Sequence, residues 1–190
     1  MAQIHRMKEV QRKEFYLFSP FLRIFHWIMV VMILVLFGTG IIIATPLQSM
    51  NLEPAYSTTY VDLVRDIHFV AAFVFCASFV LRIYGFIINR GDRLFPRFWK
   101  GYFYAQTLDV IKHYMLVQPN HASFLRNPLA RMSYLMLYGL VAIEICTGFA
   151  MYYMTEPATY IAQAFAWVNV VCGNEMVTHL VHHYAAWAII

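Results

Sequence analysis

Residues 22–45 read LRIFHWIMVVMILVLFGTGIIIAT, an apolar run in which Arg23 and His26 are the only ionisable side chains. A hydrocarbon core about 30 Å thick is crossed by about 20 such residues in a helix. Two more runs of this kind follow along the chain, and a fourth begins near its end. The sequence therefore predicts four membrane helices, over residues 22–45, 67–89, 132–154 and 176–190.

The composition supports the same class, because 61% of the 190 residues are hydrophobic and only 13% are charged, against about 25% charged in soluble domains. The first run follows a basic, polar arm and is too long for a signal peptide, so we expect it to stay as a span. The run over 176–190 is too short to cross at about 1.5 Å per residue, so we expect it to continue beyond Ile190. We predict one all-α domain over 1–190, an integral membrane four-helix bundle whose fourth helix is truncated.

The positive charges predict the orientation of the chain. All but Arg65 of the 14 lysines and arginines lie in the N-terminal arm, at the opening of the first span, or in the stretch from the last two turns of the second span to the start of the third. The positive-inside rule assigns those segments to the cytoplasm. We therefore expect a multi-pass protein of the inner, cytoplasmic membrane with a cytoplasmic N-terminus. The net charge of +4 is then a topology signal, and nucleic-acid binding is not expected.

The cytoplasmic segment over residues 95–119 mixes aromatic and basic side chains, including Trp99 beside Arg97 and Lys100. That mixture is typical of a helix lying in the headgroup region of the bilayer. The alternative is an ordinary loop with a few anchoring rings. We predict an interfacial helix between the second and third spans.

Three histidines, His26, His68 and His182, lie within the apolar runs, where an ionisable side chain is costly without a partner. His68 and His182 each lie near the non-cytoplasmic start of a helix and so share a level, whereas His26 lies near the cytoplasmic face. Two neutral imidazoles that face one another across a bundle can hold a b-type haem. No C-x-x-C-H motif supports a c-type haem. For each histidine alone, a hydrogen bond to a neighbouring helix is the alternative.

Three further residues fit a haem site. Arg23 precedes His26 by three residues, and Arg65 precedes His68 by the same spacing, so each arginine lies one turn nearer the surface and could neutralise a haem propionate. The alternative is that each arginine anchors its helix by snorkelling. Gly40 lies near the level of the His68 and His182 pair, where a small residue would admit either a macrocycle or another helix.

The strings SPFLRIFHW (19–27), RDIHF (65–69) and THLVHH (178–183) resemble the b-type cytochrome subunit of membrane-bound nickel–iron hydrogenases. That family is related to the gamma subunits of formate dehydrogenases and to the cytochromes b561. The resemblance extends over essentially the whole chain and implies two b haems, one near each membrane face. It implies that His68 and His182 ligate the outer haem iron, and that His26 ligates the inner one together with a residue beyond Ile190.

The resemblance also implies a function in electron transfer. The donor would be the iron–sulfur small subunit of a periplasmic hydrogenase, bound in turn to the large subunit, and the acceptor would be menaquinone or ubiquinone, reduced at a site on this chain. The alternatives are the gamma subunit of a formate dehydrogenase, a cytochrome b561-like quinol oxidoreductase and a passive membrane anchor. A metal-dependent intramembrane hydrolase would need an H-E-x-x-H helix, which the sequence does not contain.

Two polar residues are candidates for the quinone chemistry. Asn127 could hydrogen-bond a quinone carbonyl at the cytoplasmic side, and its alternative is a helix cap ahead of Pro128. Glu144 lies deep in the third span, either on a proton path or as a neutral, hydrogen-bonded group. Of the three clustered histidines 179, 182 and 183, the resemblance favours His182 as the ligand.

Overall fold

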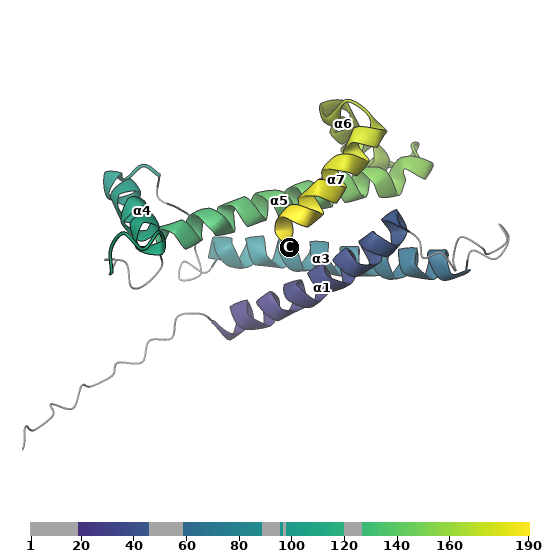
Figure 1. Cartoon of the computed structure of the whole chain (residues 1–190). Coiled ribbons are helices and arrows are strands. Elements are labelled where there is room, and N and C mark those ends of the chain that lie inside the picture. The colour runs from purple at the N-terminus through teal and green to yellow at the C-terminus, as the bar shows by residue number, and fades with distance from the viewer. Residues whose placement is uncertain (1–18, 46–58, 89–95, 97, 120–126) are drawn as a thin grey trace, which may run out of the picture.

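The computed structural model describes residues 19–45, 59–88, 96, 98–119 and 127–190. Across these ranges the chain is helical and contains no strand (Figure 1). The helices are α1 (Pro20–Ala44), α3 (Thr59–Ile88), α4 (Gly101–Tyr114), α5 (Pro128–Tyr152), the 3-10 turn η2 (Tyr153–Thr155), α6 (Tyr160–Cys172) and α7 (Glu175–Ile189).

Helices α1, α3 and α5 are long and apolar enough to cross a membrane. Much of their apolar surface faces outward: the side chain of Leu34 is 62% exposed, and that of Val80 is 58% exposed. A water-soluble protein would bury such side chains, whereas lipid solvates them. The described helices therefore have the character of a multi-pass membrane protein.

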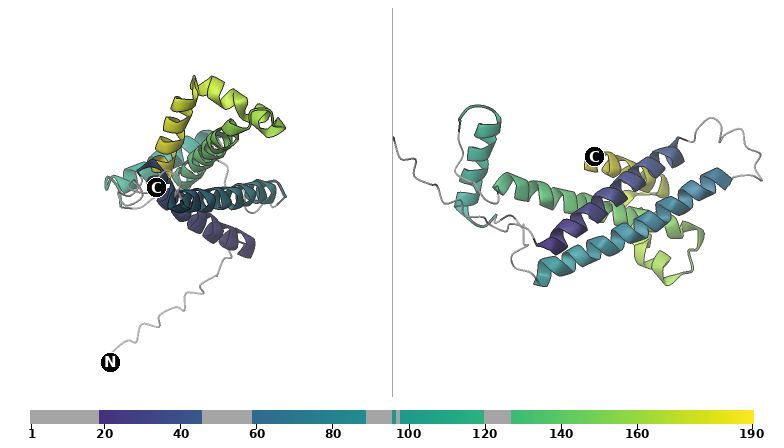
Figure 2. Two further views of the ribbon diagram at one scale, coloured as in Figure 1. Left: turned by 90° about the vertical axis from the view of Figure 1, so that its right-hand side faces the viewer. Right: turned by 90° about the horizontal axis from the view of Figure 1, so that it is seen from below.

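The helices pack as two antiparallel pairs. α1 lies along α3, and α5 lies against α7 (Figures 1 and 2). Between the pairs lies a core centred on the buried side chains of Met29, Phe75 and Val141, to which Ile189 of α7 adds. An aromatic contact also joins the two pairs. The ring of Phe37 in α1 packs edge-on against that of Trp187 in α7, with 5.0 Å between the ring centroids.

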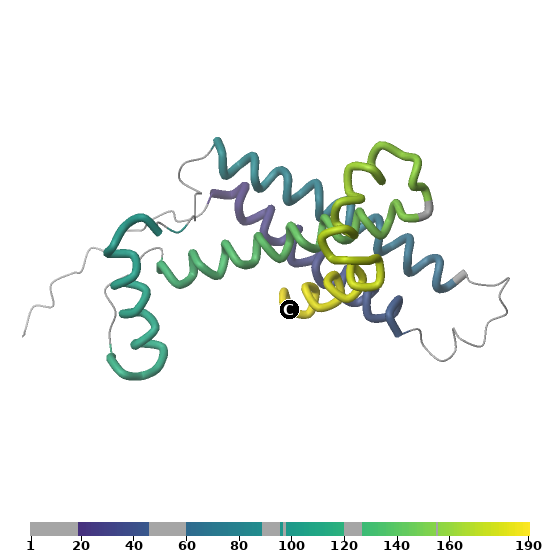
Figure 3. The backbone as a smooth tube through the Cα atoms, turned by 90° about the horizontal axis from the view of Figure 1, so that it is seen from above, coloured from purple at the N-terminus to yellow at the C-terminus, as the bar shows by residue number. Residues whose placement is uncertain are grey.

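Two shorter helices flank these pairs. α4 lies at the end of the molecule where α5 begins, and α6 lies at the opposite end, where α5 finishes (Figure 3). α4 forms inside the segment in which we predicted a helix, and it packs against α5 with Phe103 and Val110 buried. α6 was not predicted, because its 13 mostly apolar residues are too few for a span and were included in a loop.

Local sequence signals set where the helices begin. The hydroxyl of Ser19 accepts from the backbone N–H of Leu22 at the start of α1, and Pro20 occupies the first turn. α3 begins at Thr59, well before the predicted start at residue 67. The first turn of α3 is polar and contains Asp62. A negative charge stabilises the N-terminus of a helix but lowers the hydropathy of the segment. Hydropathy therefore located the apolar part of α3 but missed its polar start.

Candidate haem site

The first element of the site is a contact between His68 of α3 and Thr39 of α1. The Nδ1 atom of His68 lies 2.8 Å from the hydroxyl oxygen of Thr39. The two helices run antiparallel, so the end of α1 meets the start of α3, and both side chains point into the packed side of that pair. The imidazole of His68 is thus oriented by a neighbouring helix.

The hydroxyl of Thr39 also decides which nitrogen of His68 carries the proton. Its oxygen lies 2.7 Å from the carbonyl oxygen of Val35, one turn earlier in α1, and 3.2 Å from that of Leu36. A hydroxyl has one proton and donates it to a carbonyl in this geometry. The oxygen then accepts from Nδ1–H of His68, so Nε2 keeps a free lone pair, which is the state in which imidazole binds a metal.

The same arrangement occurs between α5 and α7. The hydroxyl oxygen of Thr147 lies 2.8 Å from Nδ1 of His182 and donates to the carbonyl of Ile143 at 2.7 Å. Thr147 is 2% exposed, so water does not compete for this contact. By the same reasoning, His182 also presents its Nε2 atom as a free lone pair.

Each threonine is followed by a glycine that lies against the same imidazole. A Cβ atom added to Gly40 would lie 3.7 Å from Cε1 of His68, and one added to Gly148 would lie 3.4 Å from Cε1 of His182. An alanine would just fit at either position, whereas a side chain that extends beyond Cβ would displace the ring. Each helix pair thus builds one unit, a Thr-Gly step on its first helix holding a histidine on its second.

The two units lie at the same end of the molecule. Phe69, the neighbour of His68, packs edge-on against Tyr152 of α5 at 4.7 Å between centroids. Tyr152 lies little more than one turn along α5 from Thr147, the residue that holds His182. Phe73 of α3 adds a contact to Phe149 of α5 at 5.7 Å. The prediction that His68 and His182 share a level agrees with these contacts.

The neighbouring histidines of α7 differ from His182. His179 and His183 are exposed, whereas His182 is half-buried. The Nε2 atom of His183 accepts a hydrogen bond from Trp187 of the same helix at 3.2 Å. The outward position of His183 separates it from the Thr147 unit, which contacts His182.

The other predicted residues occupy different surroundings. His26 is exposed on α1, in edge contact with its neighbour Trp27. Arg23 and Arg65 are exposed one turn before their histidines, on the sides where α1 and α3 begin. Asn127 caps α5, because its side-chain oxygen accepts from the N–H of Leu129 at 2.8 Å.

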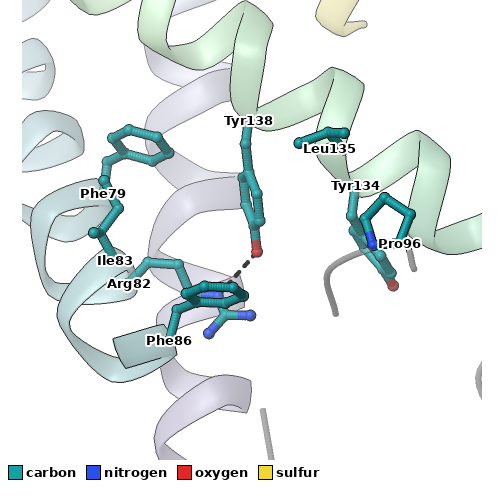
Figure 4. A pocket seen from close by; sticks show the side chains of 8 residues that line it. All are labelled: Phe79, Arg82, Ile83, Phe86, Pro96, Tyr134, Leu135 and Tyr138. Atoms are coloured by element: carbon teal, nitrogen blue, oxygen red, sulfur yellow. Dashed lines mark hydrogen bonds between the residues drawn. The ribbon is translucent and has the colours of Figure 1, made fainter. Parts of the chain in front are cut away.

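A cavity of about 270 Å³ lies between α3 and α5, far from the Thr-Gly units. Arg82 is 14 residues beyond His68 on α3, about 21 Å along the helix. Arg82 is 2% exposed, and its Nε donates to the hydroxyl of Tyr138 at 2.9 Å (Figure 4). The remaining wall is mainly apolar and aromatic: Phe79, Ile83, Phe86, Pro96, Tyr134 and Leu135.

The residues around His68 and His182 fit a b haem. A bis-imidazole haem needs two ligand nitrogens with free lone pairs, oriented by second partners, and both histidines meet this requirement. It also needs small residues beside the ligands, and Gly40 and Gly148 supply them. The described residues contain no cluster of three or more His, Cys, Asp or Glu side chains that could hold a bare metal ion.

Sequence reasoning missed Thr39 and Thr147. A threonine in a helix commonly bonds its own preceding turn, so neither draws notice alone. The sequence did offer one signal: the dipeptide Thr-Gly occurs at 39–40 and at 147–148, in the first and third predicted spans, and each of these is followed by a predicted span that carries His68 or His182.

Comparison with known proteins gives a consistent family. Residues 17–190 match the family described as prokaryotic cytochrome b561. The "Probable Ni/Fe-hydrogenase 1 B-type cytochrome subunit" of Escherichia coli (strain K12) is 30% identical over 184 residues, covering 92% of this chain and 77% of that protein. The "Probable Ni/Fe-hydrogenase B-type cytochrome subunit" of Rhizobium leguminosarum bv. viciae is 29% identical over 197 residues, covering 100% of this chain and 81% of that protein.

Proposed function

Because the chain belongs to the prokaryotic cytochrome b561 family, we propose that it carries electrons through the membrane from a nickel–iron hydrogenase to the quinone pool. The names of its relatives and the resemblance of its histidine motifs support this assignment. The donor in this proposal is the iron–sulfur small subunit, which joins the chain to the large subunit. The acceptor is menaquinone or ubiquinone.

The observation that carries the proposal is the repeated Thr–His contact of 2.8 Å in two helix pairs. In our proposal His68 and His182 are the axial ligands of one b haem near the outer face. A haem held there supplies a one-electron carrier that needs no covalent attachment. Thr39 and Thr147 hold the ligand tautomer, and Gly40 and Gly148 leave room beside the imidazoles.

We place a second b haem at the level of His26. Arg23 and Arg65 lie one turn outside His26 and His68, and each would neutralise a propionate at its own face. In this arrangement α7 completes a four-helix bundle with α1, α3 and α5. The N-terminus is cytoplasmic by its positive charge, and α4 lies in the cytoplasmic headgroup layer of the inner membrane.

We assign the quinone head group to the cavity beside Arg82. A quinone offers carbonyl acceptors on a flat apolar ring, and this cavity combines a buried guanidinium and a phenol with aromatic and aliphatic walls. Phe21 near the start of α1 lies against Gly85 of α3, one turn from Arg82, so the cavity is near the level of His26. Asn127 is a second candidate, through its amide nitrogen.

To test the proposal, the complete complex is purified from membranes and is then treated first with hydrogen and afterwards with quinone. Hydrogen should reduce the b-type absorption, and added quinone should reoxidise it. Co-purification of formate dehydrogenase subunits, with reduction by formate and none by hydrogen, would favour the gamma-subunit alternative. Reduction by quinol, with none by hydrogen or formate, would favour a cytochrome b561-like quinol oxidoreductase. A complex without haem absorption would favour a passive membrane anchor.

A further inference from the structure

An exposed apolar segment follows the end of α4. Its three residues are Met115, Leu116 and Val117, which are 70%, 92% and 70% exposed, and we call them the α4 tip. Tyr114, the last residue of the helix, is 62% exposed beside them. Contiguous exposed apolar side chains mark a surface that contacts a partner or a membrane. The α4 tip is therefore a candidate contact surface.

The backbone of the α4 tip is held in an unfavourable conformation. Leu116 has a φ of 61°, in the left-handed region that a residue with a Cβ atom adopts only at a cost. Its N–H donates to the carbonyl of His113 at 3.0 Å, and the N–H of Val117 donates to the carbonyl of Lys112 at 2.9 Å. These two bonds form a Schellman cap, whose left-handed residue is usually glycine. The chain does use glycine in this region at the end of α6, where Gly173 has a φ of 99°.

Side-chain contacts lock the same turn from behind. The amide nitrogen of Gln118 donates to the carbonyl oxygen of Asp109 at 3.0 Å, one turn and more back in α4. The Nδ1 atom of His113 lies 3.1 Å from the carbonyl oxygen of Gln118. A strained residue persists only where surrounding contacts hold it, and such residues occur at functional positions. The contacts around Gln118 thus keep a leucine pointing outward in a turn that glycine would form more easily.

Position and charge select the bilayer as the partner of the α4 tip. α4 packs against α5 and lies across its direction (Figures 1 and 3), as a helix in the membrane plane does beside a span. Lys112 is exposed one turn before the tip, and Nζ of Lys100 lies 5.6 Å from the ring centroid of Tyr102. Lysines beside aromatic rings are typical of the headgroup region, where they attract anionic lipids.

We propose that the α4 tip inserts into the cytoplasmic leaflet, at the boundary between the headgroups and the acyl chains. This inference rests on one point of the proposed function, the placement of α4 in the cytoplasmic headgroup layer. Insertion removes the apolar surface of Met115, Leu116 and Val117 from water, and this gain offsets the strain at Leu116. The inserted tip fixes the depth of α4 and, through it, of the start of α5.

The test measures the depth of single nitroxide labels on the complete protein in vesicles of phosphatidylethanolamine and phosphatidylglycerol, with the native cysteines replaced. The tip is labelled at Leu116→Cys and, separately, at Met115→Cys. Met115 has ordinary backbone angles, with a φ of −79°, so its label stays informative if a label at Leu116 disturbs the turn. Oxygen, which concentrates among acyl chains, and a water-soluble nickel chelate are the two collision reagents. Val80→Cys, on a 58% exposed position of α3, is the lipid reference, and Glu156→Cys, on an exposed position past α5, is the water reference.

We expect the ratio of oxygen to chelate collisions at both tip labels to lie several-fold above that at Glu156 and to approach that at Val80. A ratio equal to that at Glu156 would overturn the inference, because the tip would then lie in water. Few collisions with either reagent would also overturn it, because protein would then cover the tip.

Two further labels separate this inference from the placement of α4. Tyr102 and Tyr104 are 48% and 54% exposed, and residues two apart on a helix face different sides. If labels at both positions match the water reference, α4 lies outside the headgroup layer, and that part of the proposed function fails with the inference. If either label reports lipid contact while the tip labels report water, only the insertion of the α4 tip is rejected.

Discussion

The hydroxyl oxygen of Thr39 lies 2.8 Å from Nδ1 of His68 while donating its own proton to the carbonyl of Val35. This relationship fixes both the orientation of the imidazole and the nitrogen that remains free. Thr147 and His182 repeat it at the same distance. A hydrogen bond of this kind holds a ligand in the orientation and the tautomer that bind the metal.

The substitution Thr39→Val should weaken haem binding. Valine keeps the shape of threonine but cannot accept from Nδ1–H, so His68 is free to rotate or to adopt the other tautomer. Loss of such a partner costs about 10- to 100-fold in affinity. Titration of the haem-free protein with haem, followed by absorption, measures the change.

Thr45→Val is the matched control. Thr45 lies at the end of the same helix and also bonds a carbonyl one turn earlier, that of Ile41 at 2.9 Å, but it is exposed. Wild-type affinity in Thr45→Val together with weak binding in Thr39→Val is the expected pair of results. Equal affinity in the two variants would show that the Thr39 contact does not matter.

A bulky residue at Gly148 should exclude haem. A Cβ atom fits there at 3.4 Å from Cε1 of His182, so Gly148→Ala should bind haem almost normally, whereas Gly148→Leu must displace the ring. Gly139 of the same helix has open space at its Cβ position, so Gly139→Leu should keep its haem. Haem content per protein measures all three, and a haem-replete Gly148→Leu protein would contradict the close contact.

The sequence alone predicts which histidines form a pair, because the hydropathy pattern gives the depth of each histidine in the membrane. His68 and His182 both lie near the starts of apolar helices that the positive charges predict to begin on the same side of the membrane, and this shared depth pairs them. The hydropathy pattern does not give the rotation of each helix about its own axis, and this rotation decides which side chains His68 and His182 contact. Thr39 and Thr147 therefore appeared only with the packed structure.

Some helix ends could likewise be predicted from the sequence, whereas others could not. The start of α3 before residue 67 is polar, and α6 is apolar but has only 13 residues. A search for apolar runs long enough to span a membrane therefore detects neither. The cap at Asn127 was recognisable, because asparagine followed by proline is a local signal. The cavity at Arg82 was not, because it needs α3 and α5 side by side.

Arg82→Lys and Tyr138→Phe should weaken quinone binding. Lysine keeps the charge but loses the planar donor set of arginine, and phenylalanine removes the hydroxyl that accepts from Arg82 at 2.9 Å. A lost charged hydrogen bond corresponds to a rise in KM for quinone of about tenfold. Reduction of the haem by hydrogen should stay at the wild-type rate, and steady-state assays beside single-turnover spectra separate the two steps. Loss of one haem in Arg82→Lys, with KM unchanged, would instead assign the cavity to the inner haem.

Asn127→Ala should lower the free energy of unfolding by about 1 kcal/mol, because it removes the cap of α5. Asn127→Ser should restore most of that stability, since serine also caps helices but has no amide. Chemical unfolding in detergent measures both. We expect KM for quinone to stay at the wild-type value in the two variants, and a raised KM in a stable Asn127→Ser protein would instead assign the head group to Asn127.

The most direct test of the central claim is the reduced-minus-oxidised absorption spectrum of His182→Ala beside that of His183→Ala. The two side chains are adjacent on α7, but His182 is half-buried against Thr147, and His183 is exposed. Our account predicts that His182→Ala, like His68→Ala, loses the signal of the outer b haem, while His183→Ala keeps it in full. An unchanged spectrum in His182→Ala, or the loss of the signal in His183→Ala alone, would contradict the assignment of His68 and His182 as the ligand pair.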